Sequence, residues 1–378
     1  MLDDLSLLRV APFDDAIENV ERLISSPNRA FLLGAGCSKC AGLPLTTELK
    51  DLVLARVGAN TRQILGDVIA AFRGAKSSTI EEYLSELVDL MAIAKRRADC
   101  EAEDQRIDLG GQQYSLEDLS AALKEVRTSI VKCIKINADI ATHRQFINAV
   151  HRQLQSGKRE PSQPVEYLVL NYDTLVEDAL AIERVPYSDG LAGGATGWWD
   201  LAALSSDHLQ ARVIKLHGSI DWVILKDEIF PRRIREGILP ADIEVAEGAV
   251  IWPAVTKYRE TERDPFAQLA RIMRTVLHPP EHTFPVLVVC GYRFGDAHIN
   301  LELYRALKES EQRLTLLVFT EMEKPEGVLK SWHEDPTLRN QVRIHAKNGF
   351  FHTVANISES DLPWWKFEVL ARLLGGER

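Results

Sequence analysis

The stretch Phe31–Ser38, which reads FLLGAGCS, decides the fold that the sequence predicts. Its apolar half predicts a buried strand, its glycines predict a tight turn, and the residues beyond the turn suit a helix. A strand, a glycine turn and a helix in this order often lay backbone N–H groups against a phosphate. The turn departs from the dinucleotide pattern G-x-G-x-x-G, because its third glycine is missing and Gly42 falls further along. Taken alone, the turn is weak evidence for a nucleotide site.

Three further polar motifs occur later in the chain. They begin at Asn171, His217 and Gly291, and each directly follows a strand-sized apolar run. In a doubly wound sheet, ligands bind outside the carboxyl ends of the parallel strands. We therefore expect the four motifs to meet at one edge of the sheet, although Gly34 and Gly291 are more than 250 positions apart.

The order of the apolar runs predicts the fold class. The predicted strands are 29–33, 165–170, 212–216, 249–252, 285–290, 314–319 and 342–344. Helical or loop segments separate them, which is typical of an α/β protein. We predict a Rossmann-like, doubly wound and mostly parallel sheet.

The segment 59–162 has a different pattern. It contains no convincing strand, and Thr79–Glu82 and Ser115–Asp118 resemble capping boxes that open helices. The polar stretch Asp99–Gly111 suits a loop. The predicted domains are a Rossmann-like domain of residues 1–58 and 163–378 and an inserted, all-helical module of residues 59–162.

Composition narrows the class of protein. The chain has 378 residues, of which 46% are hydrophobic and 26% charged, as in a globular protein. Its formal net charge of −10 argues against sequence-independent binding to nucleic acid, which needs a basic face. Five cysteines fit a reducing cytoplasm better than a disulfide scaffold. The acidic start and the lack of a long apolar run predict a cytoplasmic protein without membrane contact.

Several candidate residues also have structural interpretations. Cys37 and Cys40 form C-x-x-C, which suits zinc or redox chemistry, but we expect two small residues packed in a turn. Asn171 and Asp173 suit an Asx turn that caps a helix, and this is compatible with contacts to a ligand. His217, at a strand end beside a glycine, is a candidate general base.

The late motif has two interpretations as well. Asp296, His298 and Asn300 either bind ribose or cap the helix that is expected to begin near Ile299. The sequence pattern alone leaves both open.

Together, the four motifs resemble those of the sirtuin-like superfamily. The matching stretches are Gly34–Ser38 with Gly42–Pro44, Asn171–Asp173, His217–Gly218 and Gly291–Asn300. The first three are similar to the superfamily's GAG-x-S…G-[IL]-P, N-[IY]-D and catalytic HG motifs. The last is similar to the G-Y-S-F-x-D-x-x-I-N motif of the bacterial defence branch. The resemblance covers about residues 29–58 and 165–320, and it implies NAD⁺ as the substrate.

The resemblance also implies a role for each matching residue. Asn171 would position the attacking water or the ribose, His217 would accept a ribose hydroxyl proton, and Asp173 would hold the nicotinamide carboxamide. The implied NAD-binding residues are Gly34, Ala35, Gly36, Ser38, Leu43, Pro44, Tyr172, Gly291, Asp296, His298 and Asn300. The glycine turn and Ser38 would cradle the pyrophosphate.

Two departures from the superfamily pattern matter. Protein-deacylating sirtuins carry a four-cysteine zinc module after the catalytic histidine, whereas only Cys290 follows His217 here. We therefore expect no zinc and no other metal. The usual serine of the late motif is Arg293 in this chain, which changes the contacts expected at the ribose.

Zinc-free members with a helical insertion resemble bacterial anti-phage proteins that cleave NAD⁺ to nicotinamide and ADP-ribose. The resemblance thus implies an NAD⁺ glycohydrolase that acts in abortive infection. Regulation by homo-oligomerisation or by a HerA-like ATPase partner is expected, because free NAD⁺ cleavage would be toxic. Two alternatives stay open: an NAD-dependent protein deacylase or ADP-ribosyltransferase, and a non-catalytic nucleotide-binding assembly module.

Overall fold

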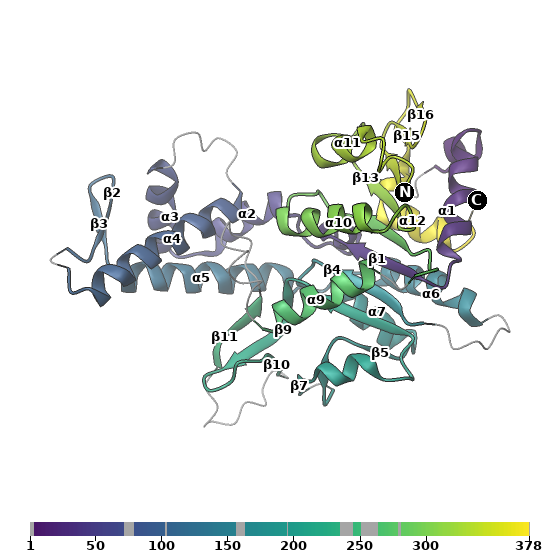
Figure 1. The fold of residues 1–378 in the computed structure, drawn as a ribbon. Helices are drawn as coiled ribbons and strands as arrows, with labels where there is room; N and C mark the ends of the chain where they lie inside the picture. Colours follow the sequence, from purple (N-terminus) through teal and green to yellow (C-terminus); the bar gives the residue numbers. More distant parts are fainter. Residues whose placement is uncertain are drawn as a thin grey trace. The chain divides into compact units, whose positions relative to one another are not determined.

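The chain divides into two compact units, and each is described by itself. The computed structural model describes residues 4–71, 79–102, 104–155, 163–194, 196–234, 245–250, 264–278 and 281–377. The first unit contains Met1–Gly42, Ala138–Ala249 and Asp264–Arg378, and the second contains Leu43–Asn137. Figure 1 labels the helices and strands of both units.

A nine-stranded sheet forms the centre of the first unit, in the order β16-β15-β14-β13-β12-β1-β4-β8-β5 (Figure 1). Its strands are β1 (Arg29–Leu33), β4 (Val165–Val169), β5 (Tyr187–Ser188), β8 (Ala211–Lys215), β12 (Val286–Cys290), β13 (Thr315–Thr320), β14 (Val342–Ala346), β15 (Gly349–Phe351) and β16 (Ala355–Ile357). The pairs from β5 to β14 are parallel, and only β15 and β16 pair antiparallel. The chain builds outward from β1 in both directions, so the predicted doubly wound, Rossmann-like sheet is confirmed.

Helices surround this sheet. They are α1 (Phe13–Ile24), α6 (Ala141–Gln155), α7 (Leu175–Ile182), α9 (Phe266–Leu277), α10 (Ala297–Glu309), α11 (Gly327–Glu334) and α12 (Phe367–Leu374), with the short 3₁₀ helices η1 (Ser6–Arg9), η2 (Ala35–Ala41), η4 (Leu201–Ser205) and η5 (Pro363–Trp365). All five residues of β1 are buried, as expected for a strand covered on both faces. Residues of α1, α6, α7 and α12 share one core with Phe31 and Leu33.

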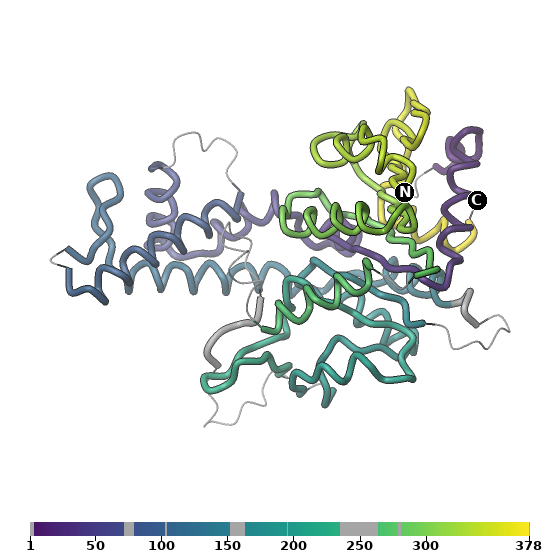
Figure 2. The backbone as a smooth tube through the Cα atoms, in the orientation of Figure 1, coloured from purple at the N-terminus to yellow at the C-terminus, as the bar shows by residue number. Residues whose placement is uncertain are grey.

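The two ends of the chain meet in this core. The rings of Phe13 and Trp364 lie 5.6 Å apart in an edge-to-face contact. Figure 2 shows the same approach, with the purple start of the trace beside its yellow end. Because Phe13 of α1 packs on Trp364 of η5, segments from the two ends of the chain contribute to one core.

A second sheet of five strands is formed by segments before and after β8, in the order β11-β9-β10-β7-β6. Its strands are β6 (Leu191–Ala192), β7 (Trp198–Trp199), β9 (Gly218–Leu225), β10 (Arg232–Arg233) and β11 (Val245–Val250). The sequence pattern predicted only its last strand, at 249–252, and residues 251–252 lie outside the described residues. Since β9 begins at Gly218, His217 occupies the turn between the two sheets.

The second unit consists of helices and one hairpin. The helices are α2 (Thr46–Arg56), α3 (Ala59–Ala71), α4 (Ile80–Asp99) and α5 (Leu116–Ile134), and the hairpin pairs β2 (Ile107–Leu109) with β3 (Gln112–Tyr114). The prediction that this module is all helical is therefore wrong. The hairpin forms because Ile107, Leu109 and Tyr114 are buried on alternate positions, and Gly110 and Gly111 adopt the positive φ angles of 63° and 90° that a tight turn requires.

The helix starts in this unit follow the capping patterns. Ser115 Oγ accepts a hydrogen bond of 3.2 Å from Asp118 N, and the Asp118 carboxylate accepts one of 2.9 Å from Ser115 N. Glu82 accepts one of 2.6 Å from Thr79 N. The division between the units differs from the predicted limit at residue 162, because α6 packs on α12 within the first unit. None of the described helices is both long and apolar enough to span a membrane.

A buried histidine makes the stability of the first unit sensitive to acid. His345 stacks on Phe319 at 4.5 Å and meets the edge of Trp364 at 5.1 Å. Burial lowers the pKa of His345 from 6.5 to about 3. Between these values the unfolded chain binds a proton that the folded chain does not, so stability falls as pH falls.

We predict that His345→Phe removes this contribution. Relative to the wild type, the variant should gain up to about 1.4 kcal/mol of unfolding free energy for each pH unit below about 6.5. Urea unfolding between about pH 7.5 and about pH 5 measures this difference. His208→Gln, at an exposed loop histidine, provides the control. An equal pH dependence in the wild type and His345→Phe would contradict the assignment.

Candidate functional site

The strand register brings the four motifs to one edge of the large sheet. Leu33 pairs with Cys290 on one side and with Val169 on the other, and Val169 pairs with Lys215. The turns after β1, β4, β8 and β12 therefore leave the sheet at the same level. This edge lies at the reversal of strand order around β1, where doubly wound proteins bind their ligands.

The glycines of the first turn allow it to pack against the turn after β12. Gly34 N donates to Cys290 O at 3.0 Å, and Gly36 N donates to Gly291 O at 2.9 Å. A Cβ atom would lie 2.5 Å from Gly291 O at position 34, and 2.7 Å from Gly291 Cα at position 36. Because both N–H groups serve this contact, the predicted pyrophosphate binding would have to come from other groups of the turn.

We predict that Gly36→Ala destabilises the first unit by about 1–3 kcal/mol, since its methyl group would overlap backbone atoms that cannot move independently. Gly295→Ala is the matched control, because a Cβ atom there has no neighbour within 4 Å. Chemical denaturation of both variants tests the prediction. Equal stability of the two variants would show that the turns do not need this close contact.

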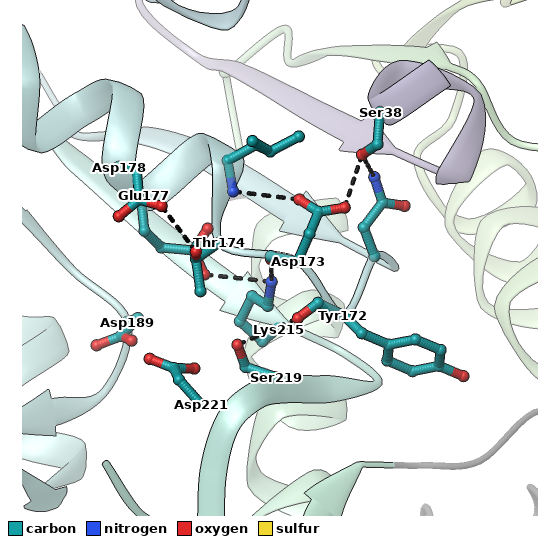
Figure 3. A network of polar contacts seen from close by, with 12 residues as sticks. Ser38, Tyr172, Asp173, Thr174, Glu177, Asp178, Asp189, Lys215, Ser219 and Asp221 are labelled. Atoms are coloured by element: carbon teal, nitrogen blue, oxygen red, sulfur yellow. Dashed lines mark hydrogen bonds and ion pairs between the residues drawn. The ribbon is translucent and has the colours of Figure 1, made fainter. Parts of the chain in front are cut away.

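Ser38 links the first turn to the second. It lies in η2 and is 3% exposed. Its Oγ donates a hydrogen bond of 2.7 Å to Asp173 Oδ2 and accepts one of 2.8 Å from Asn171 Nδ2. Figure 3 shows Ser38 above the carboxylate of Asp173. The three side chains thus form one hydrogen-bonded chain across two strand ends.

This chain fixes which way the Asn171 amide points. An ionised carboxylate only accepts, so the single hydroxyl proton of Ser38 goes to Asp173. Asn171 must then donate through Nδ2, which leaves Oδ1 on its other side. Asn171 is 7% exposed, and among the described residues nothing donates to this buried oxygen. A buried acceptor without a donor is expected to accept a hydrogen bond from a ligand or an ordered water.

Asp173 makes the Asx contact that the sequence suggested, and it also binds Ser38. Its Oδ1 accepts from Leu175 N at 3.2 Å, which is the Asx contact at the start of α7. Its Oδ2 accepts from Ser38. Both carboxylate oxygens therefore already bind internal donors, and a contact with a carboxamide would have to share one of them.

Tyr172, which lies between Asn171 and Asp173 in the chain, is anchored through its backbone carbonyl. Its carbonyl accepts from Ile220 N at 2.9 Å and from Ser219 Oγ at 3.3 Å, both on β9. The turn after β4 is thereby tied to the strand that follows His217.

His217 is 4% exposed and faces two other rings at the site. Its ring centroid lies 5.7 Å from that of His298, which lies in the first turn of α10, and 6.5 Å from that of Tyr172. The structure thus brings residues of three predicted motifs into one cluster. The second histidine places a further titratable group beside the candidate base.

The side chains of the late motif, Gly291–Asn300, form hydrogen bonds with one another and with the backbone of their own loop. Tyr292 Oη lies 3.0 Å from Asn300 Oδ1 and accepts from Asp296 N at 3.2 Å, while Asn300 Nδ2 donates to Phe294 O at 2.7 Å. Asp296 occupies the position directly before α10, but its side chain makes no capping hydrogen bond there. Both ends of the Asn300 amide bind within the loop, so its contacts favour a structural role over binding to ribose.

Other predicted residues have simpler positions. Ala35 is exposed at the start of η2. Leu43 and Pro44 begin the second unit, so their part in the site stays a prediction. Cys37 and Cys40 pack in the turn, where burial raises the pKa of both thiols, that of Cys40 to about 12. No group of three His, Cys, Asp or Glu side chains suited to a metal occurs within the described part of the chain.

Sequence reasoning missed three buried groups near the site. Lys215 pairs with Glu177 at 3.2 Å below the Asp173 turn. His143 on α6 lies within electrostatic reach of Asp173, and burial lowers its pKa to about 4. The one available signal was Lys215 itself, a lysine enclosed in the apolar run 212–216.

The comparison with protein families agrees with this geometry. Residues 165–340 match the SIR2-like domain. The match spans the motifs that begin at Asn171, His217 and Gly291, and it points to an NAD-utilising enzyme family. The glycine turn at Gly34 precedes the matched region. No curated protein matches the chain.

Proposed function

We propose that this chain is an NAD⁺ glycohydrolase, which cleaves NAD⁺ to nicotinamide and ADP-ribose. The SIR2-like match over residues 165–340 supports NAD⁺ as the substrate. The observation that carries the proposal is the chain from Asp173 through Ser38 to Asn171, which leaves a buried acceptor oxygen beside the His217 turn. An oriented acceptor and a candidate base at one sheet edge suit activation of a water or a hydroxyl.

The reaction breaks the bond between the nicotinamide nitrogen and the anomeric carbon of the ribose. Nicotinamide leaves with the bonding electron pair and becomes neutral, while positive charge develops on the ribose. Asn171 Oδ1 accepts a hydrogen bond from the attacking water, whose oxygen then bonds to the anomeric carbon. The attacking water loses one proton, which is the net proton released. The proton that His217 accepts from a ribose hydroxyl during the reaction returns to that hydroxyl before ADP-ribose leaves.

We predict that the purified protein, alone or with its activator, releases nicotinamide from NAD⁺. His217→Ala should lower the rate by about 10²–10⁴-fold, the usual contribution of a general base. Asn171→Ala should lower it as well, because the water loses its orienting acceptor. Chromatography of nicotinamide and ADP-ribose measures both effects, with His208→Ala as the control. Undiminished release by both site variants would refute the assignment of these residues.

Ser38 allows a second prediction that separates two roles. If it orders Asn171, Ser38→Ala lowers kcat and leaves KM for NAD⁺ nearly unchanged. If it binds the pyrophosphate instead, KM rises and kcat changes little. We expect the first pattern, because the hydroxyl already binds Asp173 and Asn171. Steady-state kinetics decide between them, and thermal unfolding shows whether the variant is folded.

The cellular part of the proposal is abortive anti-phage defence by depletion of cytoplasmic NAD⁺. We propose that homo-oligomerisation or a HerA-like ATPase partner controls the activity. Nicotinamide release by the chain alone and with such a partner tests this regulation. Release that requires an acyl-lysine peptide would favour a deacylase, and NAD⁺ bound but always recovered intact would favour an assembly module.

A further inference from the structure

Lys215 is a buried cation at the end of β8, directly below the predicted site. Its side chain is 0% exposed. Its Nζ donates to the backbone carbonyl of Asp173 and pairs with the Glu177 carboxylate at 3.2 Å (Figure 3). A buried ammonium is tolerated only where partners replace its water, so these contacts define its position.

Its partners belong to the segment that carries Asn171. The Asp173 carbonyl lies in the turn between β4 and α7, and Glu177 lies in the first turn of α7. The preceding carbonyl, that of Tyr172, is bound from β9 by Ile220 N and Ser219 Oγ. Two consecutive carbonyls of this turn are therefore held by groups that flank His217 in the sequence.

We propose that Lys215 is a positioning residue for the reaction, which holds the Asn171–Asp173 turn at a fixed distance from the His217 turn through the Asp173 carbonyl. This inference rests on the proposed function. The role of Lys215 is argued from geometry alone, because its ammonium links the end of β8, just before the His217 turn, to the turn that begins at Asn171. Loss of that bridge would move the acceptor oxygen relative to the base, and reactions that depend on alignment are sensitive to such shifts.

Glu177 has a different role from the carbonyl. Burial raises the pKa of Glu177 to about 7. The nearby Lys215 lowers this pKa, whereas Asp189 and Asp221 raise it further. Those two aspartates are in turn paired with Arg233. A backbone carbonyl does not titrate, so the contact between Lys215 and Asp173 persists whether or not Glu177 is charged. Glu177 therefore balances charge, while the carbonyl contact sets position.

This difference provides a matched pair of variants. Glu177→Gln removes the counter-ion but keeps the ammonium on the carbonyl. Because this leaves a buried ammonium without a carboxylate partner, its thermal stability is measured together with that of the other variants. The double variant K215M/E177Q removes the bridge as well, without leaving an unpaired buried carboxylate, which is the usual cause of severe destabilisation. A third variant, K215Q/E177Q, restores an uncharged N–H donor at position 215.

The first measurement is nicotinamide release. We expect Glu177→Gln to keep kcat close to that of the wild type and K215M/E177Q to lower kcat by about 10²-fold, the effect of a small misplacement. KM for NAD⁺ should change little in all three variants. The kcat of K215Q/E177Q should lie between those of Glu177→Gln and K215M/E177Q. Equal kcat values for K215M/E177Q and Glu177→Gln, at equal thermal stability, would overturn the inference.

The second measurement does not need activity. Hydrogen–deuterium exchange reports on the backbone of residues 170–176, where Leu175 N donates to Asp173 Oδ1. Exchange in this segment should be faster in K215M/E177Q than in Glu177→Gln, and unchanged elsewhere in the sheet. If the wild type releases no nicotinamide, the proposed function fails while this comparison still decides the role of Lys215. Equal exchange in the two variants overturns it.

Discussion

The backbone contact between the turns after β1 and β12 determines where the other groups of the site lie. Gly36 N donates to Gly291 O, and Gly291 adopts a φ of 66° with no room for a Cβ atom beside Cys37 N. This contact fixes the start of η2, and η2 in turn carries Ser38 to within 2.7 Å of Asp173. The glycines thus serve the site first by allowing two backbones to approach. Any contact with a ligand depends on that arrangement.

The second constraint is a group of buried charged side chains near the edge of the large sheet that carries the four motifs. Lys215, Glu177 and Asp189 are almost fully buried, and Arg233 closes the network by pairing with Asp189 and, at 2.6 Å, with Asp221. Such groups are costly to desolvate, so each is retained only with a partner. One contact of the network reaches the turn that carries Asn171 and Asp173, the hydrogen bond from Lys215 to the Asp173 carbonyl. Through that contact the buried charges act on the position of the turn.

The sequence predicted the large sheet because its central strands are apolar runs buried on both faces, as in Arg29–Leu33. It did not predict most of the second sheet, since strands of two residues such as Trp198–Trp199 carry no readable period. The hairpin after α4 was taken for a loop because its two strands have only three residues each, too few for a readable period. The reason for Gly36 lies in a turn more than 250 positions away, and the carbonyl that binds Lys215 lies 42 positions earlier in the chain. Contacts between segments distant in sequence decide the roles of these two residues.

The orientation of Asn171 bears on which chemistry the site favours. The group that Asn171 leaves available to a ligand is a buried acceptor oxygen, and the Asp173 carboxylate is linked to the same side chain through Ser38 by two hydrogen bonds. Both groups favour positive charge in front of them, as develops on the ribose when nicotinamide leaves in the proposed reaction. Because both oxygens of Asp173 already accept internal hydrogen bonds, the carboxylate is poorly placed to attack the ribose itself. In the proposed reaction, water is then the nucleophile, which distinguishes hydrolysis from formation of an enzyme-linked intermediate.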